Sequence, residues 1–219
     1  FYVSLKGLEQ WAETTDKPVD RAVLNSLIAG IYADYASSNR WQIRQRTNIV
    51  DEAPSSDIRE WSSNMFVQQV MKYTAGSLQD TGLLLNTSSR IYIPFVKLGD
   101  TSEYYHHDML HLLGSRGVDA LNNVMGLDKD SVVQTSVENV YLGMLDAYEK
   151  AGMDDGYVLC KLDYLNWKRN SDPTFVPYRA PQNLIGLTQD PYLAGLDKRK
   201  APFKSHDVCA EVYLAKARY

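Results

Sequence analysis

The residues best suited to chemistry lie at the middle of the chain, where three of its four histidines fall within residues 106–111. On a helix, side chains four positions apart share one face, so Glu103, His107 and His111 would form a stripe. Two imidazole groups at this spacing can bind one metal ion. Asp108 would lie at the edge of the stripe, as a further ligand or as a hydrogen-bonding neighbour of one. The spacing therefore indicates a candidate metal site at His107, His111, Asp108 and Glu103.

A second interpretation assigns no cofactor to the same stretch. In it, Tyr104, Tyr105 and the histidines form a half-exposed polar face of the helix. Met109, Leu112 and Leu113 then point into the core. Imidazole is the commonest metal ligand, but histidine is also a frequent surface residue. Two histidines do not decide between these interpretations, and the sequence supports both.

A helix must position these side chains in either case. Residues 99–103 offer three N-capping residues followed by an acid in the first turn, so we expect the helix to begin there. Gly114 and Gly117 are expected to end it. The histidines would then lie within the helix.

The rest of the chain predicts a mainly α fold with a helical bundle-like body. Amphipathic spacing and start signals predict helices from Asp16 to Tyr35, from Pro54 to Tyr73, from Asp128 to Ala151, over residues 157–167 and after Ser205. Residues 154–156 are expected to form a turn between two of them. Ile91–Val96 is expected to form a short strand or an extended buried segment, and Pro94 would confine a strand to a sheet edge.

Proline marks a change of character near the C-terminus. Five of the eight prolines fall between Ser171 and Ser205, which excludes long helices there. We therefore expect a helical body over residues 1–170, an extended Pro-rich arm over 171–205, and a C-terminal helix over 206–219 that packs on the body or on a partner.

Composition and charge exclude several classes of function. The net charge of −4 argues against a nucleic-acid-binding protein, and the short basic run 40–46 is interpreted as a solvated or partner-facing loop. No apolar run is long enough to span a bilayer. Nucleotide-binding glycine motifs and the hydrolase nucleophile elbow are missing, so an enzyme is not favoured. Cys160 and Cys209 are expected to be core thiols.

One motif resembles that of a known family. His107–His111, followed by eleven residues and Asn123, is similar to the His-Asp-x-x-His-(x)11-Glu zinc motif of a mitochondrial coenzyme Q (ubiquinone) biosynthesis family. Members of that family are helical, membrane-peripheral proteins implicated in lipid binding and in removing the ring carboxyl group of quinone precursors. The resemblance implies zinc ligands at His107, Asp108 and His111. Asn123 takes the position of the family's glutamate, so a neutral amide replaces an anionic ligand.

Two functional hypotheses follow. The first is a non-catalytic accessory subunit of a large multi-subunit assembly, of the respiratory or ATP synthase type, whose Pro-rich arm clasps a neighbouring subunit. Fifteen tyrosines and four tryptophans favour such a protein, since both residue types are enriched at interfaces. The second is a metal-binding, lipid- or quinone-binding relative of the coenzyme Q family. The chain begins at Phe1, so we expect either that a longer sequence was cut there or that a leader was removed. A removed leader fits a mitochondrial or a secreted protein, and the lack of a disulfide framework favours a mitochondrial location.

Overall fold

The computed structural model describes residues 2–46, 55, 57–93, 107–171 and 208–218. Helices contain 83% of these residues and none of them lies in a strand, which confirms the expected mainly α fold. The chain divides into two compact units. The first unit comprises Phe1–Val96 and Asp108–Leu142, and the second comprises Lys97–His107 and Gly143–Tyr219.

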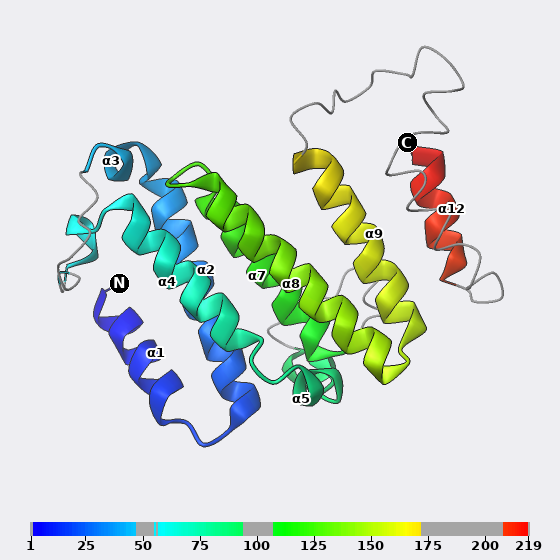
Figure 1. Cartoon of the computed structure of the whole chain (residues 1–219). Coiled ribbons are helices and arrows are strands. Elements are labelled where there is room, and N and C mark those ends of the chain that lie inside the picture. Colours follow the sequence, from blue (N-terminus) through cyan, green and yellow to red (C-terminus); the bar gives the residue numbers. More distant parts are fainter. Residues whose placement is uncertain (1, 47–54, 56, 94–106, 172–207, 219) are drawn as a thin grey trace, which may run out of the picture. The chain divides into compact units, whose positions relative to one another are not determined.

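In the first unit, one long helix, α2 (Pro18–Ser38), packs against three others (Figure 1). These are α1 (Tyr2–Thr14), α4 (Ser63–Ser77) and α7 (Met109–Val124). The unit also contains the short helices α3 (Arg40–Arg44) and α5 (Thr81–Leu85), the 3-10 helices η1 (Ile58–Glu60) and η2 (Ser89–Tyr92), and the first part of α8 (Asp130–Ala151).

The sequence of α2 suits its central place. Pro18 occupies the first turn, where its missing N–H leaves no hydrogen bond unmade, and Asp20 lies favourably at the positive end of the helix dipole. The N-cap is Lys17, so the helix begins slightly later than the Asp16 cap predicted. Its small buried residues let neighbouring helices approach closely; they are Ala22, Ser26, Ala29, Ala33 and Ala36.

Helices α4 and α7 are in close contact at Gly117, which is buried. A Cβ atom at Gly117 would lie 2.8 Å from Cγ2 of Thr74 on α4, closer than packed carbon atoms allow. The prediction that Gly114 and Gly117 end this helix is therefore wrong, because α7 continues to Val124. At Gly117 the missing side chain serves helix packing and not termination.

The second unit contains the end of α8, then α9 (Asp154–Ser171) and α12 (Cys209–Arg218). Helices α9 and α12 share an apolar core formed by Val158, Leu159, Leu162, Val208 and Val212. The predicted turn at residues 154–156 is wrong, because these residues form the first turn of α9. Asp154 and Asp155 are favourable there, since acids stabilise helix N-termini.

The predicted strand and the predicted Pro-rich arm have different outcomes. Ser89–Tyr92 forms the 3-10 helix η2, so the predicted strand is wrong for Ile91 and Tyr92. Residues 94–106 and 172–207 lie outside the described residues, and with them Pro94, the Pro-rich arm and Ser205. The predicted divisions at residues 170 and 205 stay predictions.

Candidate functional site

The histidine cluster does not lie wholly inside a helix as predicted: His111 belongs to α7, His107 precedes it, and His106 lies outside the described residues. Helix α7 begins at Met109, and Asp108 is its N-cap, with an extended backbone at φ −91° and ψ 155°. The Oδ1 atom of Asp108 accepts a hydrogen bond from the backbone N–H of His111 at 2.8 Å. Since His107 precedes the cap, His107 and His111 do not form a helical i, i+4 pair. Residues 99–103, where the helix was expected to begin, lie outside the described residues.

Further contacts hold Asp108 in this role. Ser88 and Asp108 form an isolated antiparallel bridge, and the N–H of Met109 donates to the carbonyl of Thr87 at 2.9 Å. Asp108 is only 6% exposed. Its carboxylate satisfies one of the backbone N–H groups that every helix start leaves without an intrahelical acceptor. The structure thus gives Asp108 a structural task that needs no metal.

The structure describes His111 among the other predicted ligands, but not Glu103. Burial lowers the pKa of the half-buried His111, and the negative charge of Asp108 offsets this in part. Glu103 lies outside the described residues. Within the described part of the chain, no three His, Cys, Asp or Glu side chains are grouped so that they could hold a metal ion. Zinc binding by His107 and His111 stays a prediction.

Asn123, which takes the glutamate position of the resembled motif, connects α7 to its neighbours. Its Nδ2 donates to Oδ1 of Asp34 on α2 at 3.3 Å. Its backbone carbonyl accepts a hydrogen bond from Nη2 of Arg40 at 2.7 Å. Both contacts stabilise the packing of α7 with α2 and α3.

A buried carboxylate in the first unit was not anticipated from the sequence. Glu9 on α1 is 9% exposed, and its Oε1 accepts hydrogen bonds from the hydroxyls of Tyr32 at 2.6 Å and Tyr73 at 2.9 Å. Its Oε2 lies 2.8 Å from Nζ of Lys6. The sequence does hold a signal: Leu5 precedes Glu9 by four positions on α1, so an acid lies on an apolar helix face.

The partners of Glu9 keep it ionised. Burial by itself would raise the pKa of its carboxyl group, but the hydrogen bonds from Lys6, Tyr32 and Tyr73 outweigh burial and lower it. Burial raises the pKa of Tyr73, and its hydrogen bond to Glu9 adds to the effect. A buried charge is tolerated only when such donors surround it. We name Lys6, Glu9, Tyr32 and Tyr73 the carboxylate cluster.

Aromatic rings surround the carboxylate cluster. The ring of Tyr32 stacks on Trp61 at 5.3 Å and on Tyr73 at 6.0 Å between centroids. Phe66 meets Tyr32 edge-on at 6.5 Å. These contacts place α2, α4 and the residue after η1 around one apolar centre. Each ring pair stabilises the fold beyond what its buried area alone contributes.

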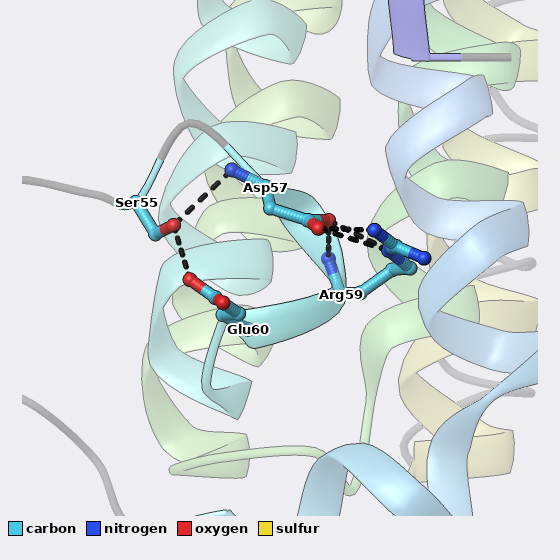
Figure 2. A network of polar contacts seen from close by, with 4 residues as sticks. All are labelled: Ser55, Asp57, Arg59 and Glu60. Atoms are coloured by element: carbon cyan, nitrogen blue, oxygen red, sulfur yellow. Dashed lines mark hydrogen bonds and ion pairs between the residues drawn. The ribbon is translucent and has the colours of Figure 1, made fainter.

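A polar network at η1 fixes Trp61. Figure 2 shows Asp57 and Arg59 facing each other, with 2.6 Å between Oδ2 and Nη2. Oδ1 of Asp57 also accepts a hydrogen bond from the backbone N–H of Arg59, and Ser55 donates to Glu60. The Nε1–H of Trp61 donates to the carbonyl of Ser55 at 2.7 Å. The network therefore orients the indole ring that stacks on Tyr32 in the core.

An exposed aromatic side chain lies on α3. Ile43 is fully buried and fixes one face of the helix, whereas Trp41 is 73% exposed. Arg40 donates through Nη1 to the carbonyl of Met125 and through Nη2 to that of Asn123. A rigid contact thus joins α3 to the turn after α7. We name Arg40, Trp41 and Arg44 the α3 surface.

Comparison of the chain with family models, with curated proteins and with solved structures finds no match in any of the three. The resemblance to the coenzyme Q family therefore stays a prediction. In the described part of the chain, no helix combines the length and the apolar character needed to cross a bilayer.

Proposed function

We propose that this chain is a non-catalytic accessory subunit that packs against another protein of a larger assembly. The observation that supports this most strongly is the exposed Trp41 on a helix that is itself held in place. Tryptophan is enriched among the few residues that dominate binding at interfaces. A subunit partner would bury it.

The way α3 is held makes Trp41 suitable as an anchor. Arg40 makes hydrogen bonds to two carbonyls at the end of α7, and the buried Ile43 holds the other side of α3. The backbone that carries the indole is therefore ordered before any partner binds. Less conformational entropy is lost on binding, which leaves more of the contact energy for affinity.

We propose a non-catalytic protein because the acidic side chains that are buried have structural roles. Asp108 caps α7, and the carboxylate of Glu9 is surrounded by donors from Lys6, Tyr32 and Tyr73. Each group stabilises the fold through contacts with its own chain. These roles account for the buried acids without a substrate.

The test is the size of the native complex. Epitope-tagged wild-type protein, Trp41→Ala and Gln42→Ala are expressed in the source cells, and solubilised mitochondria, the expected compartment, are separated by native electrophoresis. Gln42 is exposed on the same helix and serves as the matched control. Wild type and Gln42→Ala should migrate at high mass, and Trp41→Ala should move to the monomer position with an unchanged melting temperature. A monomeric wild type in every cell fraction would refute the proposal.

A further inference from the structure

We propose that the α3 surface recognises a partner segment in which acidic side chains flank an apolar one. This inference rests on the proposed function, because it specifies the chemistry of the partner that buries Trp41. Arg44 follows Trp41 by three positions on α3, so the two exposed side chains share one face of the helix. An indole and a guanidinium lie next to each other there.

The charge of the α3 surface supports an acidic partner. Residues 40–46 contain three arginines and no acid, in a chain whose net charge is −4. Arg40 and Arg46 donate to backbone carbonyls, those of Asn123, Met125 and Trp61, which carry no net charge. Hydrogen bonds to carbonyls satisfy the donors of a guanidinium but do not neutralise its charge.

Of three acids among the described residues, Asp57 forms an ion pair, and Asp34 and Asp130 accept hydrogen bonds from neutral donors, which leave their charge in place. Asp57 is paired with Arg59, although it also feels the charge of Arg46. Asp34 accepts from Asn123, and Asp130 accepts from the N–H of Gly126. None of the ion pairs among the described residues involves Arg40, Arg44 or Arg46. Within the part of the chain that the structure describes, Arg44 is exposed and no acidic side chain pairs with it, so a carboxylate of a partner could bind it.

The residue types fit a protein segment better than a nucleic acid. Guanidinium groups bind carboxylates through two parallel hydrogen bonds, and arginine and tryptophan are both enriched at binding hot spots. A nucleic acid brings a dense row of phosphates, which the net charge of −4 repels at longer range. One or two arginines are enough to bind the carboxylates of a short acidic segment.

Binding to defined probes tests the inference. Full-length protein is titrated into a labelled peptide of alternating Asp and Glu around a central Leu, into the same peptide with Lys in place of the acids, and into labelled single-stranded oligouridylate. The variants are Arg44→Glu, Arg44→Lys and the control Gln42→Ala. We expect the wild type to bind the acidic peptide alone, less tightly as salt rises from about 50 to about 200 mM.

The expected pattern among variants is specific. Arg44→Glu should weaken binding by about tenfold or more, Arg44→Lys should weaken it less, and Gln42→Ala should not change it. Equal binding by wild type and Arg44→Glu, no binding of the acidic peptide by wild type, or preference for the oligouridylate would each overturn the inference.

Native electrophoresis of the variants distinguishes the proposed accessory function from the proposed acidic partner. If Trp41→Ala leaves the assembly while Arg44→Glu remains in it, the acidic partner is wrong and the accessory function stands. A wild-type protein that is monomeric in cells but binds the acidic peptide through Arg44 contradicts the accessory function alone.

Discussion

Tyr32 donates its hydroxyl hydrogen to Oε1 of Glu9 at 2.6 Å, which connects α2 to α1 through a buried charge. Tyr73 of α4 donates to the same oxygen, so three helices meet at one carboxylate. Without the acceptor, both phenols would be left buried without their partner, and an unsatisfied buried donor costs about 1–3 kcal/mol. The carboxylate cluster therefore connects α1 to α2 and α4.

The first prediction is a pH-dependent loss of stability in Glu9→Gln. In the folded chain the pKa of Glu9 lies below its ordinary value of 4.5, because its donors outweigh burial. The ionised group therefore stabilises the fold fully above pH 4.5, and this contribution is lost as pH falls through the lower, folded pKa. At neutral pH, Glu9→Gln should reduce the free energy of unfolding by about 1–3 kcal/mol.

Urea unfolding at neutral pH and at acidic pH measures this difference. The gap between wild type and Glu9→Gln should narrow in acid. Glu13→Gln is the matched control, since Glu13 is exposed on the same helix, and it should change stability little. A gap that stays constant with pH would show that Glu9 does not act through its charge.

Two helices with one apolar face and clear end signals were predicted well from the sequence, whereas the helix predicted from Pro54 to Tyr73 begins only at Ser63. The predicted span Asp128–Ala151 corresponds to α8 at Asp130–Ala151, and Asp16–Tyr35 corresponds to α2 at Pro18–Ser38. In these stretches caps and periodicity agree, so local information was sufficient.

The carboxylate cluster and α7 were not predictable in this way. The partners of Glu9, Tyr32 and Tyr73, lie 23 and 64 residues further along the chain, so only the fold brings them together. Gly117 signals a helix end locally, but contact with α4 decides its role. For Asp108, local sequence offered competing caps, and its bridge to Ser88 belongs to the tertiary structure.

The second prediction concerns the close contact of α4 and α7. Gly117→Ala would place its Cβ 2.8 Å from Cγ2 of Thr74, so the Thr74 side chain or one of the two helices must shift. Overpacking of this kind costs about 1–3 kcal/mol. Thr74→Ser removes the offending methyl group, so the double variant Gly117→Ala, Thr74→Ser should recover most of the loss in thermal unfolding. If Thr74→Ser gives no recovery, the two residues are not the source of the strain.

The third prediction assigns Asp108 to helix capping. Asp108→Ala should lower the free energy of unfolding by about 0.5–2 kcal/mol, because the N–H of His111 loses its acceptor. Asp108→Asn should retain most of the stability, since asparagine is an equally good N-cap. Chemical denaturation in the presence of a chelator measures both values. Equal losses for Ala and Asn would point to a need for the negative charge.

The fourth prediction tests the resemblance to the coenzyme Q family directly. If His107 and His111 bind zinc as that motif implies, purified wild-type protein should contain about one equivalent of metal. His107→Ala and His111→Ala should each lose it. Elemental analysis after gel filtration measures the content, and Asn123→Glu, which restores the acidic residue of the motif, should tighten binding. Metal-free wild type that takes up no zinc on titration would contradict the resemblance.

The fifth prediction connects the turn after α7 to the exposed Trp41. Gly126 has a φ of +78°, and a Cβ there would lie 3.2 Å from Nη1 of Arg40. Gly126→Ala should therefore cost about 1–2 kcal/mol for the left-handed backbone, and it should also displace Arg40 from the carbonyls that hold α3.

Gly152 separates these two effects. Its φ is +65°, but no atom lies within 4 Å of its would-be Cβ, so Gly152→Ala carries the backbone cost alone. We expect Gly126→Ala to lose more stability than Gly152→Ala, and to change the fluorescence anisotropy of Trp41 in a variant where the other tryptophans are Phe. Because Arg40 holds α3 in place, Gly126→Ala should also weaken binding to the acidic peptide proposed as a probe of the α3 surface, whereas Gly152→Ala should not. Equal behaviour of the two variants would mean that Arg40 does not orient the α3 surface.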